Sequence, residues 1–279
     1  MNTIRRKLSL LHLFGFIFLL LLAVIIIMPF LFLLVTSVKT MGQFYQTDFE
    51  QVWFPWPLHF ENYLKALTQI ELPLYMLNSL VLCSIQTALC VISSSFVAYG
   101  FARFRFWGRE VLFILVLSVM MLPAQVTSIP LLLLYRSIRW TQTFLPLIIP
   151  YFFGSAWHIF LIRQFMLTIP AEMEEAAVID GCNTFQIWYK VIIPQSVPAL
   201  FVSGLFQFLY SWRDLLAPLM FIQNKKLYPL SVGLLYFESP TEPQATVQMA
   251  AAVIALIPTI IFFAIGRRYL ESGIQLELK

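Results

Sequence analysis

The chain has 279 residues, of which 60% are hydrophobic and only 11% are charged. This is more apolar surface than a soluble core of that length can bury, which excludes a soluble globular protein and indicates a polytopic membrane protein. The formal net charge of +4 is small and the basic residues form short clusters beside apolar runs, which excludes a nucleic-acid-binding face.

Six long charge-free intervals map the segments that can lie in lipid. A charge at the bilayer centre is costly, and the hydrocarbon core needs roughly 20 helical residues. Around these intervals we predict six transmembrane helices, at residues 11–38, 73–101, 111–134, 141–162, 197–221 and 246–266. The expected fold class is therefore all-α, a polytopic helical bundle. We expect a single domain over residues 1–279, because the spans of a bundle form one packing unit.

The first predicted span follows Arg5-Arg6-Lys7, an arrangement that is also typical of a signal peptide. Its apolar run is too long for a signal peptide and lacks an A-x-A cleavage site, so we expect a retained helix. Lys and Arg favour cytoplasmic loops. The clusters at Arg103 to Arg109 and at Arg267-Arg268 therefore predict that both termini are cytoplasmic.

The long connection at residues 163–194, between the fourth and fifth spans, is predicted to be cytoplasmic and to form two short helices. Acidic residues near its start suit a helix N-terminus, and Gly181 after Asp180 suits a left-handed helix stop. Asn183 and Gln186 have the spacing of a capping box for a second helix, which we expect to end before Pro194.

The same loop carries an ordered motif. Glu175-Ala176-Ala177 is followed by three residues, Gly181, nine residues, and then Val191, Ile193 and Pro194. This order resembles the EAA signature of ABC importer permeases, with Val191 and Ile193 in place of the usual Ile and Leu. Four stretches, one of them within this motif, resemble the carbohydrate branch, the maltose-type permeases of the second-subunit kind: Asn78–Leu80, Ala98–Phe104, Glu175–Gly181 and Tyr228–Leu234. Trp212-Arg213-Asp214-Leu215 is similar to the Trp-Asn-Glu/Asp-Phe stretch of that branch, but Arg213 replaces Asn.

The resemblance implies an ATP-driven importer of a sugar or oligosaccharide in the bacterial cytoplasmic membrane. Its expected partners are a second permease subunit, ATPase subunits that hold ATP and Mg, and an extracytoplasmic solute-binding protein. This chain has no G-x-x-x-x-G-K-[ST] phosphate loop, so we expect no enzyme activity, cofactor or metal on it. The resemblance implies that the coupling helix contacts the ATPase through Glu174, Glu175, Ala176, Ala177, Asp180, Gly181 and Pro194.

Substrate contacts are expected from polar and aromatic residues inside the spans, because sugars offer hydroxyl groups and ring faces. The candidates are Asn78, Gln125, Tyr210 and Trp212. Each of them can equally form an interhelical hydrogen bond or an interface anchor.

Three alternatives compete with this reading. An ion-coupled secondary transporter usually buries an acid near the midplane, whereas Asp214 lies near a span end, where it can pair with Arg213. A membrane enzyme needs clustered polar groups, and His12, His59 and His158 are far apart in the sequence. An ABC permease for a non-sugar solute is opposed only by the family resemblance.

Overall fold

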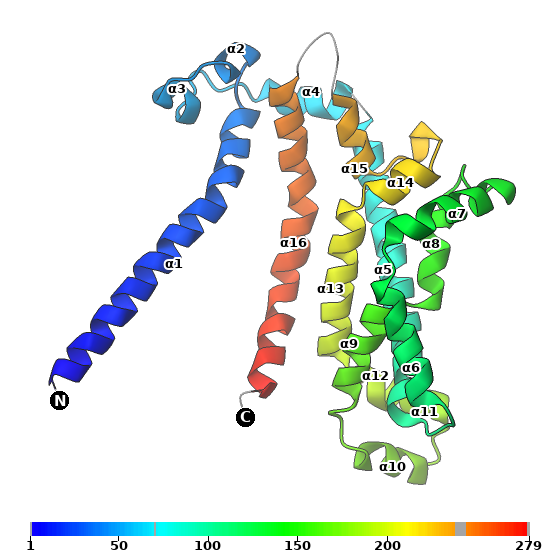
Figure 1. Cartoon of the computed structure of the whole chain (residues 1–279). Helices are drawn as coiled ribbons and strands as arrows, with labels where there is room; N and C mark the ends of the chain where they lie inside the picture. The colour runs from blue at the N-terminus through cyan, green and yellow to red at the C-terminus, as the bar shows by residue number, and fades with distance from the viewer. Residues whose placement is uncertain (1, 70, 238–243, 278–279) are drawn as a thin grey trace. The chain divides into compact units, whose positions relative to one another are not determined.

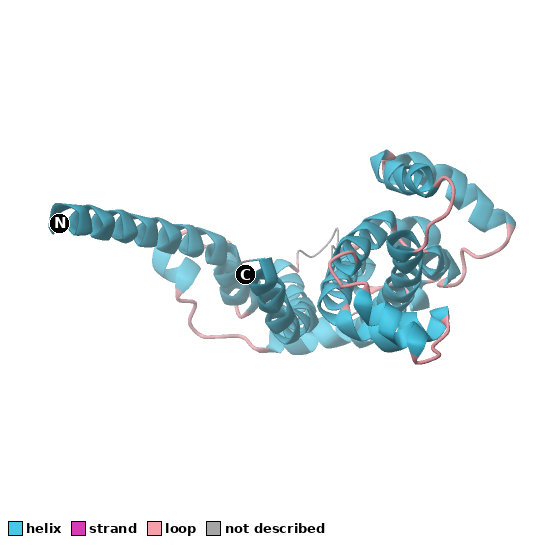
Figure 2. Ribbon diagram, turned by 90° about the horizontal axis from the view of Figure 1, so that it is seen from below, coloured by secondary structure: helices cyan, strands magenta, loops and turns pink. Residues whose placement is uncertain are grey.

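The computed structural model describes residues 2–69, 71–237 and 244–277, and their regular structure is entirely helical (Figures 1 and 2). This confirms the all-α fold class. The chain divides into two compact units. The first is Met1–Leu72 with Leu234–Leu256, and the second is Pro73–Gly233 with Ile257–Lys279. The single domain predicted from the sequence stays a prediction, and residues 1, 70, 238–243 and 278–279 of it lie outside the described residues.

The first unit is built around a long apolar helix and the loop that follows it. Asn62 fixes α4 to the end of α1, because its side-chain amide donates to the carbonyls of Ser37 at 2.9 Å and Lys39 at 2.7 Å. Helix α1 continues through Pro29 without a break. The helices of this unit are α1 (Asn2–Ser37), α2 (Met41–Phe44), α3 (Phe49–Trp53), α4 (Glu61–Gln69), the 3₁₀ helix η5 (Leu234–Phe237) and the first part of α16 (Ala245–Glu277).

The second unit contains both candidate sites. Its helices up to the 163–194 connection are α5 (Leu72–Arg103), α6 (Arg109–Ser118), η1 (Val119–Met121), α7 (Ala124–Ser137), α8 (Leu145–Ile148), η2 (Ile149–Phe153) and α9 (Ala156–Met166). They are followed by α10 (Glu172–Ile179), α11 (Thr184–Ile187), the π-helical turn η3 (Trp188–Ile192), α12 (Ile193–Gln195), α13 (Val197–Arg213), α14 (Leu216–Phe221), η4 (Lys225–Leu227) and α15 (Leu230–Gly233).

Four helical segments of the described chain are long and apolar enough to cross a membrane: His12–Ser37, Leu72–Arg103, Leu145–Met166 and Ala245–Gly266. Two bent pairs add to them, Arg109–Met121 with Gln125–Ser137 at 93° and Thr184–Gln195 with Val197–Arg213 at 78°. The chain therefore has four to six candidate spans, and six is reached only when each bent pair is counted as one.

The predicted spans at 111–134 and 197–221 are not continuous helices, which corrects the sequence-based expectation. Pro123 has no N–H to donate and disfavours helical backbone in the residue before it, so the chain turns between η1 and α7. Asp214 adopts extended backbone with φ −66° and ψ 118°, which ends α13 at Arg213 and starts α14 as a separate helix.

The predicted span at 141–162 is also interrupted, and α5 satisfies the irregular backbone. Gly154 has φ +80° and ψ 176°, a conformation that is essentially restricted to glycine. The side chain of Gln86 donates to the carbonyl of Leu147 at 2.7 Å, and Ser93 donates to the carbonyl of Tyr151 at 3.0 Å. Three hydrogen bonds secure the break, since Ser94 Oγ also accepts from the N–H of Ser155 at 3.1 Å.

Candidate functional site

The connection at residues 163–194, which we call the coupling loop after its predicted role, forms the two predicted short helices. Gly181 has φ +79° and ends α10 in a Schellman arrangement, in which Cys182 N–H donates to the carbonyl of Ala177 and Gly181 N–H to that of Val178, both at 3.0 Å. The expected capping box is present, because Asn183 Oδ1 accepts from Gln186 N–H and Gln186 Oε1 from Asn183 N–H, both at 2.9 Å. Local sequence signals therefore fix the shape of this loop.

The second helical element does not end before Pro194, which corrects that expectation. Its first turn, α11, continues into the π-helical turn Trp188–Ile192 and then into α12, which contains Pro194. Proline is tolerated there because it occupies the first turn of α12, where an N–H would have no helical partner. The loop thus leads through consecutive helical turns into α13.

The first coupling helix, α10, is anchored to the end of α5 by an ion pair between Arg103 and Glu174. The two side chains are only 15% and 16% exposed. The same guanidinium donates to the carbonyl of Ile169 at 2.8 Å, and the hydroxyl of Tyr99 donates to Glu174 Oε2 at 3.4 Å. Ala177 of α10 is buried and belongs to the hydrophobic core of this unit. Glu174 and Ala177 therefore attach α10 to this chain's own bundle.

The remaining predicted coupling residues face away from the bundle. Exposed positions are Glu175, Ala176, Asp180, Gly181 and Pro194. Apolar side chains accompany them, with Ile179 85% exposed and Val178, Phe185 and Tyr189 each at least 60% exposed. A surface that combines a carboxylate, small residues and exposed apolar side chains is suited to contact with another protein chain.

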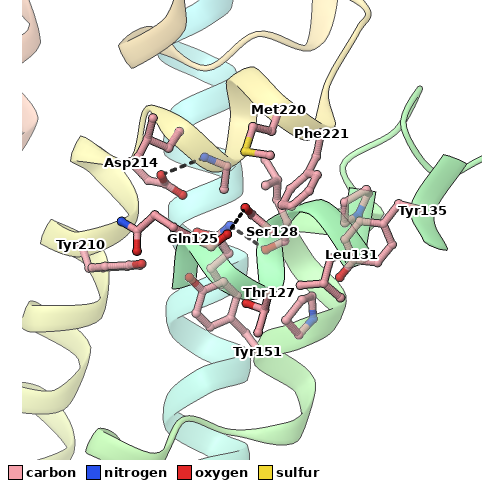
Figure 3. Close-up of a pocket in the computed structure, with 16 residues that line it drawn as sticks. Gln125, Thr127, Ser128, Leu131, Tyr135, Tyr151, Tyr210, Asp214, Met220 and Phe221 are labelled. Atoms are coloured by element: carbon pink, nitrogen blue, oxygen red, sulfur yellow. Dashed lines mark hydrogen bonds between the residues drawn. The ribbon is translucent and has the colours of Figure 1, made fainter. Parts of the chain in front are cut away.

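A polar cavity lies at the other end of α13 (Figure 3). We call it the Gln125 cavity. Its volume is about 370 Å³, and its polar lining residues are Gln86, Gln125, Thr127, Ser128, Tyr135, Tyr151, Tyr210 and Asp214. Apolar residues of α7, α8 and α14 complete the wall, including Leu131, Met220 and Phe221. The combination of hydroxyl, amide and aromatic groups is that of a pocket for a polar ligand with ring faces.

Three helix breaks of this unit, at Pro123, Gly154 and Asp214, contribute to the Gln125 cavity. Gln125 and Thr127 follow the break at Pro123, Tyr151 precedes the break at Gly154, and Asp214 forms the break after α13. Irregular backbone within a membrane is tolerated only where it is buried in protein or lines a water-filled cavity. Broken helices that meet at one cavity are also how membrane transporters build their substrate sites.

A second cavity of about 360 Å³ shares Tyr151 and Tyr210 with the first. We call it the Arg213 cavity. Its lining residues are Tyr151, Ser155, Trp157, His158, Phe206, Gln207, Tyr210 and Arg213. The two cavities therefore adjoin at these tyrosines, and Asp214 lines the first cavity while Arg213 lines the second.

Two of the four predicted substrate-contact residues, Gln125 and Tyr210, line the cavities. Asn78 does not, because its amide donates to the carbonyls of Lys226 at 2.8 Å and Tyr228 at 3.1 Å and so fixes η4 to α5. Trp212 stacks on Phe208, with the two ring centroids 5.7 Å apart, and is not among the residues that line either cavity.

Sequence reasoning missed Gln86, Tyr151 and Asp214 as lining residues. Asp214 does not pair with Arg213, since neither residue belongs to an ion pair in the part of the chain that the structure describes. Instead, Asp214 Oδ1 accepts from the N–H of Ala217 at 3.3 Å at the start of α14. Pro150 beside Tyr151 was the available signal for that residue, whereas Gln86 and Asp214 have no neighbouring proline or glycine.

A helical membrane bundle with a cavity at its broken helices and a structured loop at the far end of α13 has the architecture of a transport permease. The chain belongs to the family described as the binding-protein-dependent transport system inner membrane component, whose model matches residues 90–276. This confirms the resemblance found in the sequence and places the chain among inner-membrane components of ABC transport systems.

Individual proteins agree with this assignment. The chain is 31% identical over 260 residues to the probable ABC transporter permease protein YurM of Bacillus subtilis, covering 92% of this chain and 85% of YurM. It is 30% identical over 259 residues to the arabinooligosaccharides transport system permease protein AraQ of the same organism, covering 92% of each. In fold it is similar to a chain of a bacterial ABC transporter involved in the import of alginate, with a TM-score of 0.82, 24% identity and coverage of 92% and 96%.

Proposed function

We propose that this chain is a permease subunit of an ATP-driven importer that moves a sugar or oligosaccharide across the bacterial cytoplasmic membrane. AraQ, named for arabinooligosaccharides, supports a saccharide as the transported solute. The proposed assembly contains a second permease, ATPase subunits and an extracytoplasmic solute-binding protein. In it, this chain crosses the membrane six times, with each bent pair contributing one span, and both termini are cytoplasmic.

The observation that carries the proposal is the position of the Gln125 cavity relative to the coupling loop. The loop leads into the N-terminus of α13 through α12, and Asp214 at the cavity follows the C-terminus of α13. Seventeen helical residues separate these two points, a distance of about 25 Å. A rigid helix of this length can carry a displacement of the loop to the cavity wall (Figure 1).

The proposed coupling uses the exposed face of the loop. Glu175, Ala176, Asp180 and Gly181 contact the ATPase, while the Arg103–Glu174 pair holds α10 to α5. ATP and Mg bind to the ATPase subunits, and their closure on ATP moves the loop together with α9 and α13. The cavity then changes from outward to inward access, because the two ends of these helices move as one body.

The proposed saccharide contacts are Gln125 and Tyr210, together with Tyr151. The amide of Gln125 supplies both donors and acceptors for hydroxyl groups, and the two tyrosines supply ring faces and hydroxyls. Asn78 and Trp212 are left out of this contact set, since Asn78 holds η4 and Trp212 packs on Phe208.

The test is reconstitution of the assembled transporter in liposomes with radiolabelled oligosaccharides and the solute-binding protein. ATP inside the vesicle lumen that faces the ATPases should drive saccharide accumulation, and a Gln125→Leu variant should raise the saccharide concentration needed for half-maximal uptake about tenfold, as expected for loss of a polar contact. Saccharide uptake by this chain alone in response to a proton or sodium gradient would instead identify an ion-coupled secondary transporter.

A further inference from the structure

Arg213 introduces a positive charge at the end of an otherwise charge-free run, where the carbohydrate-importer pattern has Asn. Its side chain is exposed and lines the Arg213 cavity with Trp157 and Tyr210. A charge at the end of a membrane span requires compensation by water, lipid headgroups, another protein group or a ligand. The guanidinium of Arg213 therefore needs a partner of one of these kinds.

The chain's own described residues do not neutralise Arg213. The ion pairs among them join Lys65 to Glu61, Arg103 to Glu174 and Arg109 to Glu110. Asp214 is adjacent in sequence, but its carboxylate accepts from the N–H of Ala217, and Asp214 lines the Gln125 cavity and not the Arg213 cavity. Among the eight residues that line the Arg213 cavity, none is acidic.

The chemistry of the cavity fits a charged saccharide. Guanidinium groups bind carboxylate, sulfate and phosphate through two parallel hydrogen bonds, which a neutral hydroxyl cannot reproduce. Trp157 and Tyr210 present aromatic surface beside Arg213, and Ser155 adds a hydroxyl group. A sugar ring next to the aromatic side chains would place a ring substituent within reach of the guanidinium.

We infer that the Arg213 cavity receives a negatively charged group of the transported saccharide, a carboxylate, sulfate or phosphate, and that Arg213 sets a preference for acidic over neutral saccharides. This inference rests on the proposed function and adds the charge of the substrate to it. Tyr151 and Tyr210 line both cavities, so a saccharide in the Gln125 cavity lies against the same two side chains that border the Arg213 cavity.

The experiment measures ATP-dependent uptake of two matched probes by the assembled transporter in liposomes, digalacturonate and the neutral disaccharide galactobiose, each with saturating solute-binding protein. Wild type should take up digalacturonate at least tenfold more efficiently. Arg213→Gln and Arg213→Asn should remove that preference, since a charge-assisted hydrogen bond accounts for a factor of about ten or more. Arg213→Lys should retain part of it, because the charge remains while the paired geometry is lost.

Arg136→Gln is the matched control, because Arg136 is an exposed arginine of the same unit that lines neither cavity. It should leave the preference unchanged. Equal uptake of both probes by wild type, or a preference that survives Arg213→Gln, overturns the inference and leaves the saccharide importer intact. Absence of uptake of any saccharide overturns the proposed function as well.

Two further outcomes assign the guanidinium to another partner. An effect of Arg213→Gln that appears only in liposomes containing phosphatidylglycerol, with unchanged probe preference, would show that the charge pairs with lipid phosphate. The second permease could instead be lost from the complex when Arg213→Gln is purified, while Arg213→Lys keeps the wild-type preference in full. That combination would show that the Arg213 guanidinium pairs with an acidic residue of the second permease. Either result overturns the inference.

Discussion

Replacement of Glu174 by Gln should loosen the coupling helix from the bundle. The substitution keeps the size of the side chain but removes the charge that pairs with Arg103. Arg103 would still donate to the carbonyl of Ile169 at 2.8 Å, so the segment before α10 would stay attached while α10 itself loses its ion pair with this guanidinium. The contact from the hydroxyl of Tyr99 at 3.4 Å is long and contributes little.

The burial of the pair sets the size of the effect. Breaking a fully buried pair costs about 3–5 kcal/mol, whereas an exposed pair contributes about 0–1 kcal/mol. Side chains that are 15% and 16% exposed lie between these limits and nearer to the first, which gives a cost of roughly 2 kcal/mol. Local opening of α10 should then increase about 30-fold.

Amide hydrogen exchange of residues 172–179 in the assembled transporter measures this opening directly. Saccharide moved per ATP hydrolysed should fall in parallel, because a loosened helix transmits less of the ATPase motion. Glu175→Gln is the matched control, since Glu175 is the next residue but is exposed and belongs to none of the described ion pairs. Wild-type exchange rates in Glu174→Gln, or equal increases in exchange in both variants, would show that the Arg103–Glu174 pair does not hold α10 to α5.

Three further predictions each concern a single residue. Glu175→Arg should leave the complex assembled in the membrane but abolish ATP-dependent uptake, which transport assays in liposomes will measure. Gly154→Ala should destabilise the second unit by about 1–3 kcal/mol, because it forces alanine into a glycine-only conformation and places its Cβ 3.2 Å from Ser94 Oγ. Thermal unfolding in detergent measures this loss. The control is Gly100→Ala, whose Cβ meets no atom within 4 Å. Asn78→Leu should cost about 2 kcal/mol in the same assay by leaving two carbonyls unpaired, without changing the concentration of saccharide needed for half-maximal uptake.

The coupling loop could be predicted from sequence because its determinants are local. The helix stop at Gly181 and the capping box of Asn183 and Gln186 each depend on residues within five positions of one another. The motif at Glu175-Ala176-Ala177 then predicted contact with an ATPase for that loop. The same reasoning could not separate Glu174 from Glu175, since the difference is made by Arg103, which lies 71 residues away from Glu174 in the chain.

Asn78 shows the same limit for the substrate contacts. A polar residue in an apolar run is compatible with a ligand contact and with a structural hydrogen bond, and only the position of the partner decides. The partner carbonyls of Lys226 and Tyr228 lie about 150 residues further along the chain. Gln125 has the same residue chemistry, yet it lines a cavity because the turn at Pro123 directs the chain toward α14.

Charge-free length identifies where the chain can lie in lipid, but it does not establish that a helix is continuous. The predicted spans at 111–134, 141–162 and 197–221 each contain a break, at Pro123, Gly154 and Asp214. Each break leaves backbone groups without helical partners, which lipid cannot satisfy, so such residues must meet polar side chains or a solvated cavity. Gln86, Ser93 and Ser94 satisfy the break at Gly154, and the flanking residues of all three breaks line the Gln125 cavity. Interruptions of apolar runs by proline, glycine or an acid therefore locate the cavity, whereas the gaps between charges locate only the spans.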